Sequence, residues 1–104
     1  MIYGDEGSDN LYGQMGDDKI YGGDGRDTIY GDILDGDNPN FFGDDKLFGG
    51  ADDDTMIGGH GDDIMFGGAD EDDMFGGAGE DIIYGGDGVD TIDTGSGWDT
   101  VFGG

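Results

Sequence analysis

Residues 76–84 read GGAGEDIIY, and residues 58–66 (GGHGDDIMF) and 22–30 (GGDGRDTIY) repeat that pattern with the same spacing. Each copy has a glycine-rich half that ends in aspartate and a second half with one large aliphatic residue or methionine in its middle. Rows of nine residues that begin at residue 4 stay in phase as far as Phe102. The chain is therefore built from one repeated unit, whose positions we number one to nine.

Two positions of the row carry most of the pattern. Both fail only in the row that begins at residue 31, at Gly36 and Asn38. Position six holds Asp9, Asp18, Asp27, Asp45, Asp54, Asp63, Asp72, Asp81, Asp90 and Asp99. Position eight holds Leu11, Ile20, Ile29, Leu47, Met56, Met65, Met74, Ile83, Ile92 and Val101. An apolar residue between two outward ones predicts a strand of about three residues. Two rows then form a coil of about 18 residues, and stacked coils form two short parallel sheets.

The composition indicates that a cation is needed for folding. The chain has 3 basic and 27 acidic residues among 104, a net charge of −24. One core side chain per row buries too little apolar surface to order the backbone. Three basic residues cannot neutralise a phosphate backbone, so nucleic acid is excluded as a partner. Cysteine is absent, and carboxylate and carbonyl oxygens suit hard ions such as Ca²⁺.

The glycines at positions one, two and four predict a tight turn, because they permit positive φ and close approach of successive turns. The aspartate at position six then directs its carboxylate toward the carbonyl groups that this turn exposes. No HExxH, GxSxG or GxGxxG motif is present, and there is a single histidine, so we expect no enzyme activity of this chain alone.

The rows at 13–30 and 49–102 resemble the RTX (repeats-in-toxin) calcium-binding repeats of proteins that Gram-negative bacteria export by type I secretion. The resemblance implies an all-β, right-handed parallel β-roll with several Ca²⁺ ions held between successive turns at each edge. Carried over to this sequence, one edge has the carboxylates of Asp9, Asp27, Asp45, Asp63, Asp81 and Asp99, and the other has those of Asp18, Asp54, Asp72 and Asp90. Backbone carbonyls of turn residues such as Gly23, Gly25, Gly59, Gly61, Gly77, Gly79, Gly86 and Gly88 complete the implied ligand set.

The resemblance also implies a function. Such a module folds on calcium outside the cell and supports secretion and folding of an attached enzyme, toxin or adhesin. Residues 1–104 are then one module, expected to be a piece of a larger secreted protein whose C-terminal export signal lies beyond this sequence. The expected partners are calcium ions and the attached domains, and no apolar stretch is long enough to span a membrane. An alternative function is an adhesive or polysaccharide-binding surface that uses outward aromatic side chains.

Residues 31–48, GDILDGDNPNFFGDDKLF, are irregular and admit two interpretations. In one they fill a full coil, with Leu34 in the core and a bulge near 38–42. In the other, residues 33–42 are a loop within a single row. We favour the full coil, because it aligns an unbroken aromatic column at position nine. That column would comprise Tyr12, Tyr30, Phe48, Phe66, Tyr84 and Phe102, with Tyr21, Pro39, Ile57, Phe75 and Asp93 on the opposite face. The column either packs between strands or forms a contact face.

Other departures from the repeat carry smaller expectations. Asp52 and Asp70 replace the glycine of position four, so they adopt either left-handed geometry or another backbone. Gly36 predicts the weakest ion sites on its own edge, unless Asp32 substitutes for the missing aspartate. We expect His60 to be a surface residue and Trp98 to cover the end of the roll. The acids at position five, including Asp17, Asp44, Asp53 and Asp62, are expected to provide solubilising charge.

Overall fold

The computed structural model describes residues 1–32 and 42–104. These residues form strands and turns and contain no helix, and hence none long and apolar enough to cross a membrane. The strands are β1 (Ile2–Glu6), β2 (Asn10–Tyr12), β3 (Lys19–Asp24), β4 (Thr28–Tyr30), β5 (Lys46–Ala51), β6 (Thr55–His60), β7 (Ile64–Ala69), β8 (Asp73–Ala78), β9 (Ile82–Asp87), β10 (Thr91–Ser96) and β11 (Thr100–Phe102).

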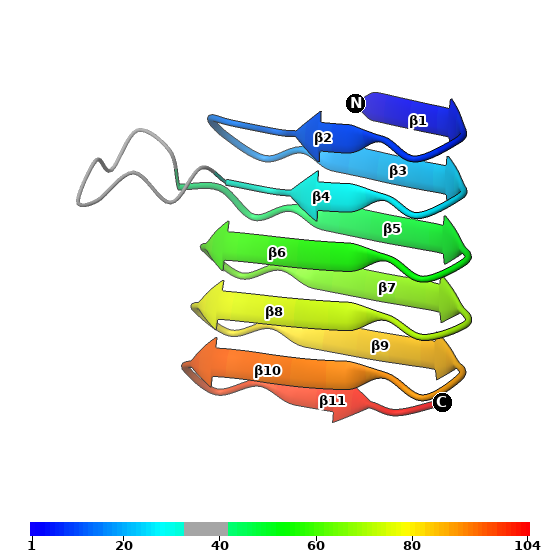
Figure 1. Cartoon of the computed structure of the whole chain (residues 1–104). Coiled ribbons are helices and arrows are strands. Elements are labelled where there is room, and N and C mark those ends of the chain that lie inside the picture. The colour runs from blue at the N-terminus through cyan, green and yellow to red at the C-terminus, as the bar shows by residue number, and fades with distance from the viewer. Residues whose placement is uncertain (33–41) are drawn as a thin grey trace.

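The strands form two parallel sheets that face each other (Figure 1). One sheet has the order β1-β3-β5-β7-β9-β11 and the other the order β10-β8-β6-β4-β2. Successive strands of the chain alternate between the sheets, so each coil contributes one strand to each. Outside the coil that contains residues 33–41, paired residues are 18 apart, as for Leu47 and Met65. The expected all-β parallel β-roll with two rows per coil is confirmed.

Most strands are longer than the three residues that the alternation predicted. Strand β7, for example, runs from position seven of one row to position three of the next and includes Gly67 and Gly68. The glycine-rich half of each row also pairs with the adjacent coil, because successive coils approach very closely there. A Cβ on Gly68 would lie closer than 3.0 Å to the carbonyl oxygen of Gly50 in the adjacent coil. Side-chain alternation alone does not reveal this glycine ladder.

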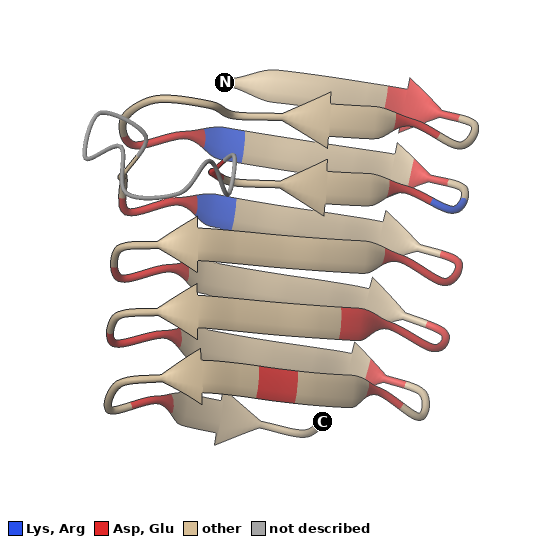
Figure 2. Cartoon of the chain, turned by 60° about the vertical axis from the view of Figure 1, so that its left-hand side comes forward, with Lys and Arg blue, Asp and Glu red and all other residues tan. Residues whose placement is uncertain are grey.

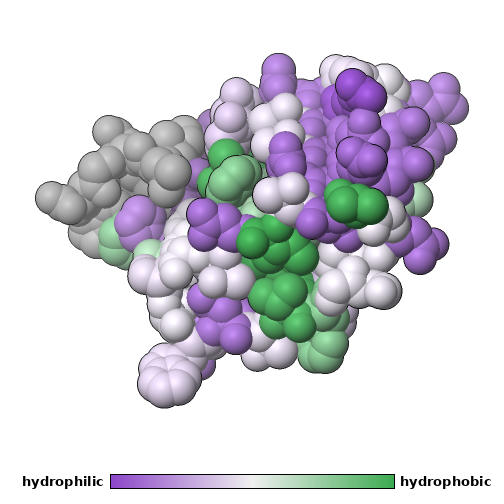
Figure 3. All heavy atoms as spheres, turned by 60° about the horizontal axis from the view of Figure 1, so that its bottom comes forward, coloured by the Kyte–Doolittle hydropathy of each residue, from purple (hydrophilic) through white to green (hydrophobic). Residues whose placement is uncertain are grey.

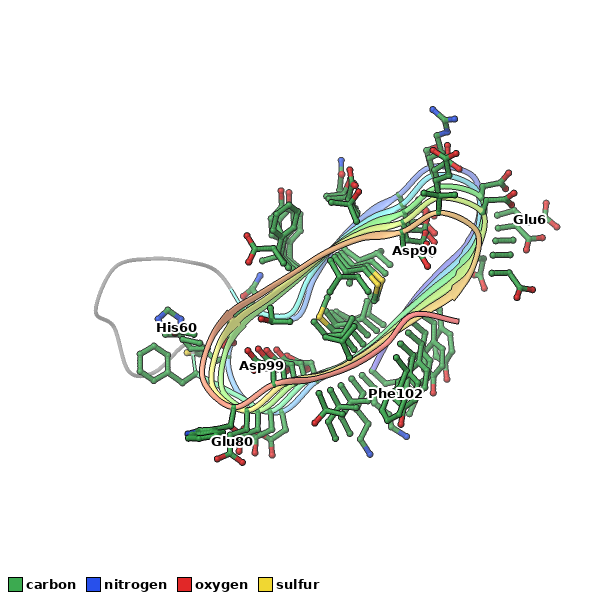
Figure 4. All side chains as sticks on the ribbon, turned by 90° about the horizontal axis from the view of Figure 1, so that it is seen from below. Glu6, His60, Glu80, Asp90, Asp99 and Phe102 are labelled. Carbon is green, nitrogen blue, oxygen red and sulfur yellow. The ribbon has the colours of Figure 1, made fainter. Side chains whose placement is uncertain are left out.

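The core is a single column of position-eight side chains between the two sheets (Figure 4). Ile2, Leu11 and Ile92 pack against it from both ends of the roll. Toward the C-terminal end a small hydrophobic area lies within hydrophilic surface (Figure 3), and Val101 of β11 is 44% exposed. The fully buried members are Ile20, Ile29, Leu47, Met56, Met65, Met74 and Ile83.

The favoured interpretation of residues 31–48 is wrong. Strand β3 pairs directly with β5, with Ile20 opposite Leu47, so these residues do not form an 18-residue coil of their own. One row instead starts at Gly31 and resumes at Gly43, with an insertion between its positions two and four. The separation across this coil is 27 residues against 18 elsewhere, an excess of one row length. The expected bulge near 38–42 lies, apart from Phe42, outside the described residues.

The aromatic columns differ accordingly from the prediction. One sheet carries an unbroken stack with ring centroids 4.7–5.0 Å apart, and its second member, Tyr21, stands next to Phe48. The members of this stack are Tyr3, Tyr21, Phe48, Phe66, Tyr84 and Phe102. At position nine, the other sheet has only one stacked pair among the described residues, Tyr12 and Tyr30, followed by Ile57. Because the rings stack on one another, the column packs between adjacent strands.

Candidate metal centre

The position-six aspartates form two ladders, one at each edge of the roll. Within a ladder, the backbone N–H of each aspartate donates to Oδ1 of the aspartate one coil further on, as from Asp63 to Asp81 at 2.9 Å. Figure 4 shows Asp90 and Asp99 at opposite edges with their side chains inside the coil. The continuous edge comprises Asp9, Asp27, Asp54, Asp72 and Asp90. The interrupted edge, whose turn 31–45 contains the insertion, comprises Asp18, Asp45, Asp63, Asp81 and Asp99.

These ladders correct the predicted edges. The prediction put Asp18 with Asp54 and Asp9 with Asp45, whereas Asp18 donates to Asp45 at 2.8 Å. The error follows from counting the insertion of one row length as a row of its own, which exchanges the edges for every row before it. The weak sites expected beside Gly36 have no counterpart in the described part of the chain, because Asp18 and Asp45 are direct neighbours in the ladder. Gly36 itself lies outside the described residues.

The second carboxylate oxygen of these aspartates has no hydrogen-bond partner within residues 1–32 and 42–104. In every position-six aspartate from Asp9 to Asp90, Oδ2 is buried and accepts no hydrogen bond from these residues. The side chains of Asp63 and Asp81 are fully buried, and Asp27 and Asp54 are 2% exposed. A buried carboxylate without a compensating charge is strongly unfavourable. The two edges therefore present rows of inward oxygens that need a proton or a cation to compensate their charge.

The glycine at position one creates the space in front of each unpartnered oxygen. A Cβ on Gly22 would lie closer than 3.0 Å both to Asp27 Oδ2 and to the carbonyl oxygen of Gly49 in the next coil. The same two kinds of oxygen surround the Cβ position at Gly4, Gly13, Gly31, Gly49, Gly58, Gly67, Gly76 and Gly85. Gly22 has no positive φ, so glycine is required there for space rather than for backbone geometry.

This set of oxygens fits a hard divalent cation. In residues 1–32 and 42–104, no three His, Cys, Asp or Glu side chains form a metal cluster by themselves. The oxygens that do converge are one carboxylate and one carbonyl per turn, from adjacent coils. Calcium accepts such mixed oxygen ligands in flexible arrangements, whereas magnesium demands a small octahedral shell. The aspartates and the carbonyls of position one are thus the groups that would hold Ca²⁺.

Burial also changes the acidity of these carboxyl groups. Burial raises the pKa of Asp63 to about 8 and that of Asp45 and Asp54 to about 7, although a backbone N–H partner opposes each shift. The pKa of Asp72 is raised to about 6 by the same cause. Burial raises the pKa of Asp81 too. Neutralisation of these groups in the folded chain therefore requires either a proton or a cation.

The predicted carbonyl ligands belong to positions two and four. In the structure these carbonyls lie over the glycine backbone of the following coil, as Gly59 does over Gly77 and Gly61 over Gly79. Their role as ligands stays a prediction. The carbonyl that lies with Oδ2 around the Cβ position of each position-one glycine belongs to position one itself, which sequence reasoning missed. Its only sequence signal was the regular glycine at position one.

Several smaller expectations can be compared with the structure. Asp52 and Asp70 have φ of 76° and 79°, which confirms left-handed geometry. His60 is not simply a solvated side chain, since its ring stacks on Phe42 with centroids 4.3 Å apart. Trp98 is 87% exposed and so does not cover the end of the roll.

The acidic side chains at position five add order as well as charge. On the interrupted edge, Asp44 Oδ1 accepts the backbone N–H of Asp62 at 2.9 Å, and Asp62 Oδ1 accepts that of Glu80 at 2.8 Å. Asp17 accepts from Asp44 in the same way. Acidic residues accordingly line the turns at both edges (Figure 2). This outer ladder runs outside the inner one formed by position six.

Comparison with known proteins agrees with this geometry. The family model of the RTX calcium-binding nonapeptide repeat, which spans four copies of the repeat, matches residues 3–38, 41–74 and 75–104. No curated protein and no solved structure gives a match. The matched ranges cover nearly all of the chain, and this repeat family implies calcium binding. The chain belongs to the family of RTX calcium-binding nonapeptide repeats.

Proposed function

We propose that this chain is a calcium-dependent folding module that supports secretion and folding of an attached exported enzyme, toxin or adhesin. The observation that carries the proposal is the row of buried, unpartnered Oδ2 atoms at each edge of the described roll. Without cations, these groups and a net charge of −24 oppose the compact state at neutral pH. With cations bound, the same groups hold adjacent coils together.

This arrangement supports a switch that depends on location. Extracellular calcium modules bind with dissociation constants of about 10⁻⁴ to 10⁻³ M, well above the free calcium of a cytosol. The chain would remain unfolded inside the cell and could pass a narrow export channel, because cysteine is absent and no disulfide fixes it. It would fold outside the cell. The family's β-roll is a structural calcium-binding module rather than a catalytic fold, so an attached domain would supply any activity.

Circular dichroism of the chain in EDTA and then in calcium tests the proposal. We expect a disordered spectrum in EDTA at neutral pH and a β-sheet spectrum after addition of about 1–10 mM Ca²⁺. Magnesium at the same concentration is the matched control and should give little β-sheet. A β-sheet spectrum that persists in EDTA at neutral pH would contradict the proposal. A sub-micromolar calcium midpoint would leave calcium binding intact but remove the link to export.

A further inference from the structure

Asp32 occupies an unusual place in the roll. At positions two and four, every described residue has positive φ except Asp32 and Gly43. These two residues flank the insertion, so among the described residues the positive φ of these positions is lost only beside it. Other non-glycine residues at position two, Asp5 and Gln14, keep positive φ and are exposed. Asp32 is fully buried instead.

The side chain of Asp32 joins the two ends of the insertion. Its Oδ2 accepts the backbone N–H of Gly43 at 3.3 Å and that of His60 at 3.2 Å. Its backbone N–H donates to the carbonyl oxygen of Gly58 at 2.9 Å, as position two does in a regular row. Asp32 Oδ2 thus receives hydrogen bonds both from the resumed row and from the adjacent coil.

The other oxygen, Oδ1, is buried and has no hydrogen-bond partner among the described residues. Asp32 directly follows Gly31, whose Cβ position is surrounded by Asp45 Oδ2 and the carbonyl oxygen of Gly58. The carboxylates of Asp18, Asp45 and Asp63 are close enough to interact electrostatically with Asp32. Burial raises the pKa of Asp32 and the negative charge of Asp18 adds a smaller increase, although the backbone N–H donors of His60 and Gly43 and the side chain of His60 oppose the shift.

We propose that Asp32 is an additional ligand for a divalent cation, which it shares with Asp45 at the interrupted turn. This inference rests on the proposed calcium binding and extends it to a position that the regular repeat fills with glycine. A side-chain carboxylate at position two gives this turn one more negative oxygen than the regular turns have. The ion would hold the resumed row at Gly43 against the row that ends at Asp32. The insertion would then be tolerated because its two ends are fastened at one cation.

Substitution of Asp32 by asparagine tests the ligand. Asparagine keeps an acceptor for the N–H groups of Gly43 and His60 but removes the charge and one oxygen. In calcium titrations by calorimetry, we expect D32N to lose one ion, or to bind it at least about tenfold more weakly than the wild type. D5N is the matched control, since Asp5 is at position two of another row and is exposed. It should bind as the wild type does.

The outcomes separate this inference from the proposed function. If the wild type binds no calcium, the proposed function fails. If the wild type binds calcium and D32N binds the same number of ions with the same affinity, only the role of Asp32 is overturned. Should D32N fail to fold, the side-chain carboxyl ¹³C resonance of Asp32 in the folded, calcium-saturated wild type decides the question. A carboxylate bound to Ca²⁺ should stay ionised, as that of Asp45 does, when the pH is lowered from about 8 to about 5, and protonation of Asp32 over this range while Asp45 stays ionised would overturn the inference.

Discussion

The two edges of the roll differ in one turn. On the continuous edge, Asp27 and Asp54 belong to intact turns, and the insertion lies between them only along the chain. On the interrupted edge, the turn that ends in Asp45 itself contains the insertion. Both ladders nevertheless continue through this coil with N–H to Oδ1 distances of 2.8–2.9 Å. A row can therefore contain an insertion between positions two and four without loss of register in the neighbouring coils.

The comparison also shows which interactions are local. Strand pairing and the inner ladder of position-six aspartates depend on residues that are adjacent in space. They are therefore unchanged by the insertion. Among the described turn residues, only Asp32 and Gly43 lose positive φ, and the carboxylate of Asp32 supplies the hydrogen bonds for the altered turn. The interrupted edge consequently has one more buried carboxylate than the continuous edge. The following predictions test how far the two edges are equivalent.

The largest expected effect is that of pH on the metal-free chain. A carboxyl group with a raised pKa in the folded state favours folding fully below its unfolded pKa of 3.8. That contribution is lost as the pH rises through about 6 for Asp72, about 7 for Asp45 and Asp54, and about 8 for Asp63. In EDTA, we therefore expect β-sheet content to increase on acidification from about pH 8.5 to about pH 4.5. Circular dichroism over this range measures it.

Asparagine substitutions at one aspartate of each edge compare how the two edges contribute to this pH dependence. Asp63, on the interrupted edge, has the higher folded pKa, and Asp72, on the continuous edge, has the lower one. D63N should therefore remove the part of the pH dependence near pH 8, and D72N the part near pH 6. Metal-free β-sheet content that does not change with acidification would contradict the link between buried carboxyl groups and folding.

The second prediction concerns the space in front of Oδ2. A Cβ on Gly58 would be closer than 3.0 Å to Asp63 Oδ2 and to the carbonyl oxygen of Gly76. G58A should therefore lower the free energy of unfolding in calcium by at least about 2–3 kcal/mol, through overpacking and loss of an ion. Chemical denaturation in saturating calcium measures the change. Gly103 has open space around it, so G103A should be nearly neutral.

The matching substitution on the continuous edge is G67A, which meets Asp72 Oδ2 and the carbonyl oxygen of Gly85. We expect similar losses for G58A and G67A, because both turns are regular and the oxygens are the same. A severe loss for G67A with none for G58A would show that only the continuous edge holds ions in this way.

The repeat made most of the fold predictable. Nine-residue periodicity placed the core residues, such as Leu47 and Met65, and all the position-six aspartates correctly within their rows. It could not decide between the two interpretations of residues 31–48, because an insertion of one row length leaves the phase unchanged, and the loop within a single row is the one that agrees with the pairing of Ile20 and Leu47. The column that begins at Tyr3 and Tyr21 and continues at Phe48 was an equally unbroken aromatic alternative. Tyr3 precedes the first full row, so the rows alone do not reveal this second column.

Of the candidate site, the sequence predicted the aspartate side chains but not the backbone carbonyls beside them. The direction of a backbone carbonyl depends on the φ and ψ angles of the turn, and the residue type alone does not fix these angles. Gly22 and Gly23 are both glycine, yet only Gly23 has positive φ. The position-one carbonyls beside Oδ2 were therefore missed. The sequence pattern suggests Asp32 only as a substitute for an aspartate at position six, whereas in the structure it lies at position two of the turn that contains the insertion.

A smaller effect is expected from the outer ladder. On the interrupted edge, Asp44 Oδ1 accepts the backbone N–H of Asp62 at 2.9 Å, one coil beyond the insertion. D44A removes this hydrogen bond at an exposed site and should lower the free energy of unfolding in calcium by about 0.5–1.5 kcal/mol. Thermal or chemical denaturation in saturating calcium measures it. E80A is the control, because within the described ranges the carboxylate of Glu80 accepts no backbone hydrogen bond. A loss in D44A no greater than in E80A would mean that the outer ladder contributes charge alone.

The smallest effect is expected at the ion pair of the continuous edge. Arg26 Nη2 lies 2.6 Å from Asp53 Oδ2, but the two side chains are 74% and 40% exposed. Exposed pairs of this kind contribute little, so R26A should lower the free energy of unfolding in calcium by less than about 0.5 kcal/mol, and less still at high salt. Asp53 Oδ1 also accepts the backbone N–H of Glu71 at 3.2 Å. D53A should therefore cost more than R26A, and the difference measures that hydrogen bond. If R26A costs as much as D53A and more than about 1 kcal/mol, the ion pair itself fastens the continuous edge, in the way that we assign to Asp32 on the interrupted one.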